Sequence, residues 1–401
     1  MDYPFVILFF LAAYLIGKTA LSTLALVLLV FGAAFSAASL CSAWMVLRRP
    51  APLGGALAPV TILKPLKGCD RGLYENLASF CDQDYPRFQI LLSVASPDDP
   101  ALPVAERLKK NFPERDIRIV ISDECIGHNP KISNVSNAYP LAEHDLLLMS
   151  DSDIRVPPDF LRRSVAAFTD PRVGLVTAFY RSAGAAGVWS ILESFSVNFN
   201  FLPQTLLAKA FGMRFAMGAA ILVRRQLFDR IGGFAALADH LADDFALGEA
   251  VEAAGSRIAF SDVVVESIPP EASGLFEMFR HQVRWQRTVR LCHPAGYCGS
   301  LLLHGFSLAS LALLFFGWNP RLAAGAVLLL ALKAAAGLAI QRLSGAMPRL
   351  LPVTWLPLSE WLGFAAWLSG FGPSAVLWRG QRYRVLPDGR LVPPSAARGL
   401  P

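Results

Sequence analysis

Charged residues are scarce in this sequence of 401 residues: Asp, Glu, Lys and Arg make up 17%, whereas hydrophobic residues make up 54%. The mean hydropathy is +0.43. Such a composition is too apolar for an ordinary soluble protein and indicates an integral membrane protein. Internal repeats are also missing, as are low-complexity tracts outside the apolar ends, so a repeat architecture is not indicated.

Two further absences concern cysteine pairs and basic runs. The six cysteines form no Cys-x-x-Cys pair, so neither a zinc site nor a disulfide framework is indicated, and a reduced cytoplasmic state is the simplest interpretation. Runs of Lys or Arg with interleaved aromatic residues are missing, and we therefore expect no nucleic-acid partner. The net charge of +6 suits a membrane-facing or phosphate-handling surface instead.

The first apolar region, residues 1–49, is predicted to be an N-terminal membrane segment. Residues from Leu21 to Leu47 carry no charge and exceed the roughly 20 residues that a spanning helix needs. Arg48 and Arg49 follow, so the positive-inside rule places the next part of the chain in the cytoplasm. The stretch Tyr3–Gly17 lacks the preceding basic residue of a cleaved signal, and we expect a short second span or an interfacial segment there.

The second apolar region, residues 296–378, holds three candidate spans, which are Ser300–Trp318, Leu322–Ile340 and Leu350–Trp378. The last contains Pro352, Pro357, Gly363, Gly370 and Pro373, so it is expected to be broken or re-entrant. Three clean crossings would place the basic tail, residues 379–401, outside the cell against the charge rule. One C-terminal segment is therefore expected not to cross fully.

Residues 50–295 have mixed composition, hold most of the charge and are large enough for one domain. Strand-like runs alternate with helical patterns such as Leu73–Cys81 and Pro103–Asn111, which predicts an α/β fold with a mostly parallel sheet. In such sheets ligands bind beyond the carboxyl ends of the strands. The expected strands are Val60–Leu63, Phe88–Val94, Ile117–Ser122, Leu146–Met149, Val173–Phe179, Ala219–Val223 and Ile258–Glu266.

Asp151-Ser152-Asp153 is the most informative motif, because it follows the buried strand Leu146–Met149 directly. Two carboxylates one residue apart at a strand end can share one hard cation, and Mg²⁺ or Mn²⁺ prefers such oxygen ligands, completed by water and substrate phosphates. The alternative is an ordinary turn, since Asp and Ser are common turn residues. We therefore predict a divalent cation held by Asp151 and Asp153.

Two polar elements lie near other predicted strand ends. Asp98-Asp99 follows the strand Phe88–Val94, where a carboxylate can accept hydrogen bonds from a nucleotide, although a solvated turn before Pro100 is the better explanation of this motif taken alone. Lys131 follows Asn129-Pro130, where it can neutralise a diphosphate or simply belong to the first turn of a capped helix.

Asp243-Asp244 and the basic segment near residues 273–292 complete the polar elements. Two adjacent carboxylates in an apolar context are costly unless they are exposed, paired or functional, and one of them can act as a general base. In the basic segment, Arg280, Arg284 and Arg287 recur at helical spacing among apolar residues. This pattern predicts an amphipathic helix at the membrane surface, with Arg284 able to hold a leaving diphosphate through two parallel hydrogen bonds.

The order of these motifs resembles membrane-bound GT-A glycosyltransferases that use nucleotide sugars, most closely the ceramide glucosyltransferase group. The resemblance covers residues 58–292. The matching stretches are Leu63-Lys64-Pro65-Leu66-Lys67-Gly68, Asp84-Tyr85-Pro86, Asp98-Asp99-Pro100, Gly127-His128-Asn129-Pro130-Lys131-Ile132, Asp151-Ser152, Ile154-Arg155-Val156, Ala242-Asp243-Asp244 and Arg284-Trp285.

The resemblance implies a role for each matched residue. Asp99 would contact the nucleotide, and Asp151 with Asp153 would manage the metal-bound diphosphate. Asp244 would be the catalytic base, while Arg284 and Trp285 would serve the leaving group and the acceptor.

The sequence departs from the family pattern at three places. His281 stands where the closing motif of the family has Gln or Arg, and we still expect it to bind substrate. The animal ceramide enzymes look to have Gly at the position of Asp153, so metal binding is expected to be stronger here. The segment Val188–Phe211, assigned to the acceptor, matches poorly. A bacterial group that glycosylates polyol-bearing hopanoids shares the motifs and the same Ala- and Arg-rich composition.

Together these features predict an inverting glycosyltransferase of a bacterial inner membrane, with its catalytic domain in the cytoplasm. It would move a glucose or N-acetylglucosamine type of sugar from a UDP-sugar to a lipid hydroxyl, with a bacteriohopanetetrol-type hopanoid favoured slightly over ceramide. The rival predictions are a processive polysaccharide synthase, which needs a translocation channel, and a non-catalytic membrane scaffold.

Overall fold

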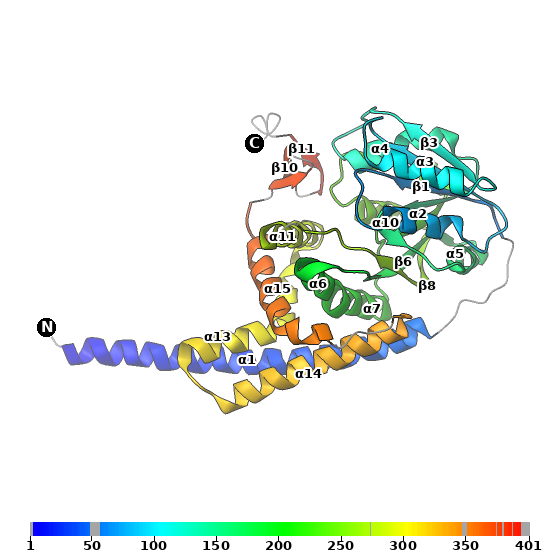
Figure 1. Cartoon of the computed structure of the whole chain (residues 1–401). Coiled ribbons are helices and arrows are strands. Elements are labelled where there is room, and N and C mark those ends of the chain that lie inside the picture. Colours follow the sequence, from blue (N-terminus) through cyan, green and yellow to red (C-terminus); the bar gives the residue numbers. More distant parts are fainter. Residues whose placement is uncertain are drawn as a thin grey trace.

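The structure is a computed structural model that describes residues 3–48, 57–272, 274–346, 351–373, 375–378, 381–386 and 388–393. An eight-stranded sheet forms its centre, and a bundle of long apolar helices lies beside it (Figure 1). The strands of the sheet are β1 (Val60–Pro65), β2 (Phe88–Val94), β3 (Asp116–Ile121), β4 (Leu146–Ser150), β5 (Ile154–Arg155), β6 (Val173–Ser182), β7 (Ala220–Arg224) and β8 (Arg257–Ser267).

Helices occupy the connections between these strands and both ends of the chain. Those of the sheet region are α2 (Leu73–Cys81), α3 (Ala101–Asn111), α4 (Pro130–Ala138), η1 (Tyr139–Leu141), α5 (Phe160–Ala166), η2 (Ala167–Thr169), α6 (Gly187–Phe195), the π-helix η3 (Ser196–Phe201), α7 (Leu202–Ala210), α8 (Arg225–Arg230), α9 (Gly233–Leu237), α10 (Asp243–Ala253) and α11 (Leu275–Cys292). Those of the apolar ends are α1 (Tyr3–Leu47), α12 (Pro294–Gly299), η4 (Ser300–Leu303), α13 (Gly305–Phe316), α14 (Pro320–Leu343), η5 (Leu351–Trp355) and α15 (Leu356–Gly370).

The strand order is β3-β2-β1-β4-β7-β6-β8-β5. Four neighbouring pairs are parallel, namely β1–β2, β2–β3, β1–β4 and β6–β8, whereas β7 and β5 run antiparallel to their partners. The prediction of an α/β fold with a mostly parallel sheet is therefore confirmed. Because β1, β2 and β4 are parallel, their carboxyl ends lie at one edge, which is where the predicted site residues begin.

The sheet is buried on both faces, which explains why its strands read as continuous apolar runs. Successive side chains of a strand point to opposite faces. Accordingly, Ile62 belongs to a core that includes Phe80 of α2, whereas the adjacent Leu63 belongs to a second core that includes Val135 of α4. This double burial holds the strands rigidly and fixes the loops at their carboxyl ends.

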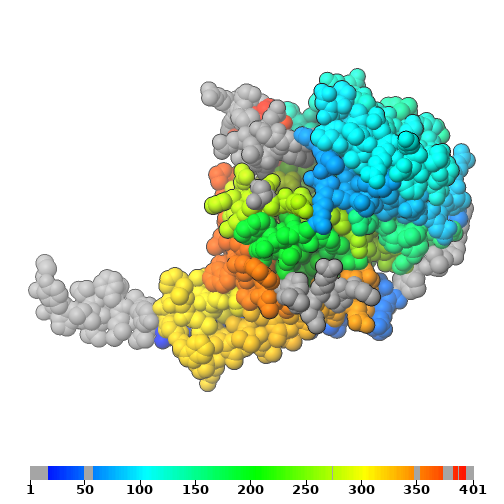
Figure 2. Space-filling model, in the orientation of Figure 1, coloured from blue at the N-terminus to red at the C-terminus, as the bar shows by residue number. Residues whose placement is uncertain are grey.

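Among the described residues, two helices are long and apolar enough to span a membrane, Gly17–Leu47 within α1 and Pro320–Leu343, and a third span results if one bent pair is counted. The bent pair is Pro294–Leu303 with Gly305–Phe316, which meet at 58°. Large apolar side chains on these helices are exposed, among them Val30 and Val327. Figure 2 shows the helices as an elongated body beneath the sheet region.

Several details of the apolar ends differ from the sequence-based expectation. Residues 3–47 form one continuous helix, so Lys18 does not separate two segments. The segment expected at Ser300–Trp318 is bent rather than straight. The segment expected at Leu350–Trp378 contains a helix of only 15 residues, α15, followed by a strand. Arg49 and residues 394–401 of the basic tail lie outside the described residues.

A second sheet forms near the C-terminus from β9 (Ala375–Trp378), β10 (Gln381–Val385) and β11 (Leu391–Val392). It packs against the loop that precedes α10. The Leu391 amide donates to the Asp239 carbonyl oxygen at 2.7 Å, and the Leu241 amide donates to the Gly389 carbonyl oxygen at 3.0 Å. The part of the chain predicted to be only a basic tail therefore supports the segment that carries Asp243 and Asp244.

Candidate active site

The loop after β2 places Asp99 close to the loop after β1. One carboxylate oxygen of Asp99 accepts hydrogen bonds from the Gly68 amide at 2.8 Å and from the Ala101 amide at 2.9 Å. Asp98 is exposed. Asp99 therefore ties two strand-end loops together, and its contact with a nucleotide stays a prediction.

Lys64, the penultimate residue of β1, lies fully buried beneath the Asp151 loop. Its ammonium donates to Ser150 Oγ at 3.0 Å and to the Asp151 carbonyl oxygen at 2.7 Å, and it lies 3.6 Å from the centre of the Phe80 ring. Burial lowers the pKa of Lys64 to about 7, against the attraction of Asp153 and Asp151. Sequence reasoning quoted Lys64 only as part of a motif, and the structure shows that it fixes the backbone of Asp151.

Lys131 joins two carboxylates that are far apart in the sequence. Its ammonium lies 2.9 Å from Asp151 Oδ1 and 3.1 Å from Asp243 Oδ2. It is held there because α4 begins at the N-cap Asn129, whose side chain accepts from the amides of Lys131 and Ile132. Burial opposes the charge, but the neighbouring carboxylates outweigh it and raise the pKa of Lys131, so a positive charge is fixed at the strand edge.

Asp153 is the second carboxylate of the predicted metal pair. Its Oδ2 accepts from the Ser267 hydroxyl at 2.8 Å. Burial, followed by repulsion from Asp151, raises the pKa of Asp153 to about 6. A divalent cation would relieve this repulsion, and both residues offer the hard oxygen ligands that Mg²⁺ and Mn²⁺ prefer.

The two carboxylates thus fit a divalent cation as a partial ligand set. Within the described ranges no group of three or more His, Cys, Asp or Glu residues could hold a metal ion. Water and substrate phosphates would have to supply the remaining ligands, as is usual for Mg²⁺ bound with a nucleotide.

Asp243 and Asp244 begin α10, where the positive end of the helix dipole favours acidic residues. Asp244 Oδ2 accepts from the Gly218 amide at 2.8 Å. A Cβ at position 218 would lie only 3.3 Å from the same oxygen, so the close approach suits glycine. Burial and repulsion from Asp243 raise the pKa of Asp244 to about 6, near the value that suits a general base at neutral pH.

Helix α11 carries His281, Arg284 and Trp285, and it packs against α6 and α15. Burial lowers the pKa of Arg284, whereas Glu193 and Asp151 act in the opposite direction. Arg284 thus lies within electrostatic reach of the Asp151 loop, as the prediction of a diphosphate contact requires. The rings of His281 and Trp285 are 4.7 Å apart.

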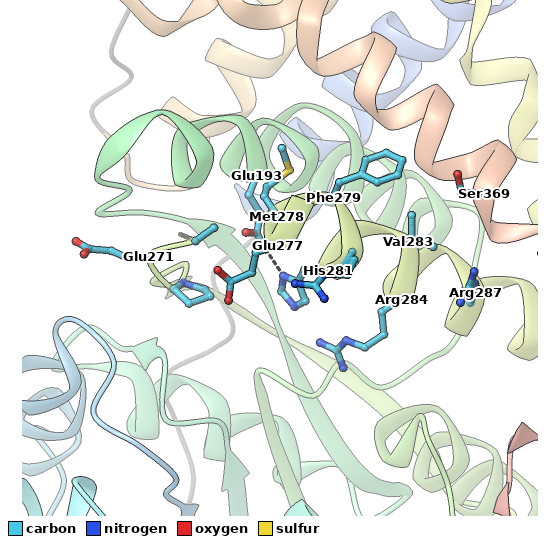
Figure 3. A pocket seen from close by; sticks show the side chains of 13 residues that line it. Glu193, Glu271, Glu277, Met278, Phe279, His281, Val283, Arg284, Arg287 and Ser369 are labelled. Atoms are coloured by element: carbon cyan, nitrogen blue, oxygen red, sulfur yellow. Dashed lines mark hydrogen bonds and ion pairs between the residues drawn. The ribbon is translucent and has the colours of Figure 1, made fainter. Parts of the chain in front are cut away.

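A cavity of 680 Å³ opens along α11. Arg284 and His281 project into it from α11 toward the sheet region, and Glu193 of α6 meets the ring of His281 (Figure 3). Ser369 of α15 lines the opposite part. The residues that line the cavity come from α6, the segment before α11, α11 itself and α15.

Sequence reasoning missed two residues of this region. Glu193 belongs to the segment that matched the family poorly, and its only sequence signal was a carboxylate in the apolar helix of α6. Tyr180 of β6 is buried near three carboxylates. Its pKa is raised first by burial and then by the negative charges of Asp244, Asp153 and Asp151. A tyrosine in a β-strand is unremarkable in sequence, so nothing marked Tyr180 as a site residue.

The sequence profile of glycosyl transferase family 21 matches residues 24–391. Ceramide glucosyltransferase 1 of Caenorhabditis elegans is 28% identical over 206 residues, which are 51% of this chain and 44% of that protein. The ceramide glucosyltransferase of Komagataella phaffii is 38% identical over 124 residues, which are 30% of this chain and 24% of that protein. The matches thus span less than half the length of these relatives.

Among solved structures, the mannosyltransferase PcManGT of Pyrobaculum calidifontis, in complex with GDP-Man and Mn²⁺, has 19% identity and a TM-score of 0.49, with 87% of this chain and 98% of that chain covered. The TarS protein of S. aureus in complex with UDP-GlcNAc has 14% identity and a TM-score of 0.39, with 83% and 98% covered. The profile match extends over most of the sequence, from α1 to β11. This chain therefore belongs to glycosyl transferase family 21.

Proposed function

We propose that this chain is an inverting glycosyltransferase that moves a sugar from a UDP-sugar to a lipid hydroxyl at a membrane surface. The observation that carries this proposal is the charge arrangement at the strand edge, where Lys131 bridges Asp151 and Asp243 beside Asp244. Fixed positive and negative groups of this kind suit a nucleotide diphosphate and the proton transfer that accompanies its departure.

The donor would be held by residues of two loops and two helices. Asp99 would accept hydrogen bonds from the nucleoside through its remaining oxygen, while Lys131 and Arg284 would neutralise the diphosphate. Asp151 and Asp153 would hold Mg²⁺ or Mn²⁺, and the cation would supply further neutralisation of the leaving group. The pairing of Lys131 with Asp151 supports this arrangement, because both groups lie where the phosphates would approach.

Asp244 would act as the base in a single displacement. Its carboxylate takes the proton of the acceptor hydroxyl while the hydroxyl oxygen bonds the anomeric carbon, and the bond from that carbon to the diphosphate oxygen breaks. UDP leaves with the electron pair. One displacement inverts the anomeric centre and yields a β-glycoside, and the pKa of Asp244, raised to about 6, keeps the base ionised at neutral pH.

The acceptor would reach this site from the membrane. Of the helices that contain the predicted acceptor segment, α7 packs against α1, η3 packs against α14 and α6 packs against α15. The cavity along α11 also opens beside α15. Two lipids are proposed as acceptors: ceramide, supported by the names of the relatives, and a polyol-bearing hopanoid, supported by the sequence resemblance. We also propose a bacterial inner membrane with the sheet region in the cytoplasm, because Arg48 follows α1.

The test is transfer by the purified chain in liposomes. UDP-glucose and UDP-N-acetylglucosamine are each offered with ceramide or bacteriohopanetetrol, and products are identified by mass spectrometry, with Asp244→Asn as the inactive control. We expect one sugar per lipid. Products with many sugars would support the processive polysaccharide synthase, and neither product nor UDP release would support the non-catalytic scaffold. Either result would refute the proposal.

A further inference from the structure

The proposed mechanism does not use Glu193. This residue is only 3% exposed, so its carboxylate is buried. Burying a charge is costly unless it is paired and hydrogen-bonded. The partner that the structure provides is His281, whose Nδ1 lies 2.5 Å from Glu193 Oε1. This contact joins α6 to α11 at the wall of the 680 Å³ cavity (Figure 3).

The contact with Glu193 fixes the orientation of the imidazole. An ionised carboxylate only accepts hydrogen bonds, so Nδ1 donates. In the neutral ring Nε2 is then an acceptor, and this atom has no hydrogen-bond partner among the described residues. Because the His281 side chain is 27% exposed and lines the cavity, Nε2 is available to a ligand inside it. The Trp285 ring, 4.7 Å away, restrains the imidazole further.

The same cavity reaches the proposed donor site through Arg284. Arg284 lines this cavity together with His281 and Glu193, and the charges of Glu193 and Asp151 both oppose the lowering of its pKa. A molecule held at His281 would therefore lie next to the diphosphate. At the other end, Ser369 of α15 lines the cavity on the side of the apolar helices.

We propose that the Glu193–His281 pair recognises the hydroxylated headgroup of the lipid acceptor, with His281 Nε2 hydrogen-bonded to one of its hydroxyls, which can donate to the neutral ring or accept from the charged one. Glu193 is a positioning residue that acts through His281. The inference rests on the proposed glycosyltransferase function and deepens it, because it assigns the cavity to the acceptor rather than to the donor. Asp244 remains the base, and the pair determines which lipid is held beside it.

The test compares acceptor kinetics with donor kinetics. His281→Phe keeps a ring beside Trp285 but removes both nitrogens, and Glu193→Gln keeps the shape of the side chain but removes its charge. We expect the KM for the lipid acceptor to rise about 10- to 100-fold in both variants, as for loss of a hydrogen bond to a charged or oriented partner. The KM for the UDP-sugar and the slow release of UDP without acceptor should stay unchanged. His293→Gln, a change at an exposed histidine of the same region, is the matched control.

Three outcomes decide the matter. Wild-type acceptor KM in a folded His281→Phe protein overturns the inference while leaving the proposed function intact. A rise in the KM for the UDP-sugar in both variants also overturns it, because the pair would then serve the donor. If the unmodified chain transfers no sugar to any lipid, the proposed function fails and the inference fails with it. Should His281→Phe not fold, the isosteric Glu193→Gln gives the same comparison.

Discussion

Replacing Asp244 with Asn should make the protein more stable at neutral pH while it abolishes most turnover. Burial and the neighbouring Asp243 displace the pKa of Asp244 from the ordinary value of 3.8 to about 6. At about 1.4 kcal/mol per pKa unit, the folded state loses about 3 kcal/mol when Asp244 ionises. The attraction of Lys131 is already contained in this difference. For a folded domain of this size, the Asp244→Asn substitution should raise the Tm by roughly 5–10 °C.

The sign of this effect depends on pH. Below the ordinary pKa of 3.8, Asp244 is mostly protonated in the folded and unfolded states, so the ionisation penalty fades and the two proteins should approach the same Tm. As the pH rises from 3.8 to about 6, the wild-type protein should lose more stability than the variant, and above the folded pKa the Tm difference should stay at its full size. Turnover should fall by about 10²- to 10⁴-fold, as for loss of a general base.

The assay is thermal unfolding in detergent between pH 4 and pH 8, together with transfer kinetics at pH 7.5. The Asp239→Asn variant is the matched control, and its change in stability should have the opposite sign. Burial would raise the pKa of Asp239, but hydrogen bonds from His128 outweigh burial and lower it. That variant should be destabilised at pH 8. Equal melting of Asp244→Asn and wild type at pH 8, or a difference that does not change with pH, would refute the electrostatic reasoning. Near-normal turnover would place the base elsewhere, with Asp243 as the next candidate.

Three further outcomes are expected. Excess chelator should abolish transfer, and Mg²⁺ or Mn²⁺ should restore it, because Asp151 and Asp153 form an oxygen-ligand pair; full activity in chelator would remove the metal role. The Arg284→Lys variant should lose much activity in both detergent and anionic liposomes, because an ammonium group cannot reproduce the two parallel hydrogen bonds of a planar guanidinium. The Arg280→Lys variant, changed at an exposed position, should lose little activity. Equal losses of activity at both positions would contradict the diphosphate contact. The Lys64→Met variant should have a nearly unchanged Tm, but its turnover should fall by up to ~10²-fold because the Asp151 loop is displaced. Unchanged turnover would show that the hydrogen bonds from Lys64 are not needed to position this loop.

Local sequence patterns were sufficient to predict the sheet and the edge at which its ligands bind. The predicted strand Phe88–Val94 and helix Leu73–Cys81 have the same bounds in the structure, because the first is a short buried run and the second has a helical period of apolar residues. The carboxylates at Asp99 and Asp151 follow strand ends, so their place at one edge follows from parallel pairing alone.

Pairings across long sequence separations could not be predicted in this way. Lys131 and Asp243 meet only because α4 and α10 approach the same edge of the sheet, and no periodicity encodes that approach. Glu193 was overlooked because its partner, His281, lies 88 positions away.

The strand β10 did leave a signal: Tyr383 and Val385 are buried while Arg384 between them is exposed, which is the alternation of a half-buried strand. The high basic content of the tail obscured it.

The contact between the last sheet and the loop before α10 has a consequence for synthesis. The backbone of residues 239–241 is held by Gly389 and Leu391, so the segment ahead of Asp244 gains these hydrogen bonds only after nearly the whole chain has left the ribosome. By then α13, α14 and α15, which lie between them in sequence, have been made and can enter the bilayer. A nascent chain would therefore acquire its complete catalytic segment last, at the membrane where its proposed acceptor resides.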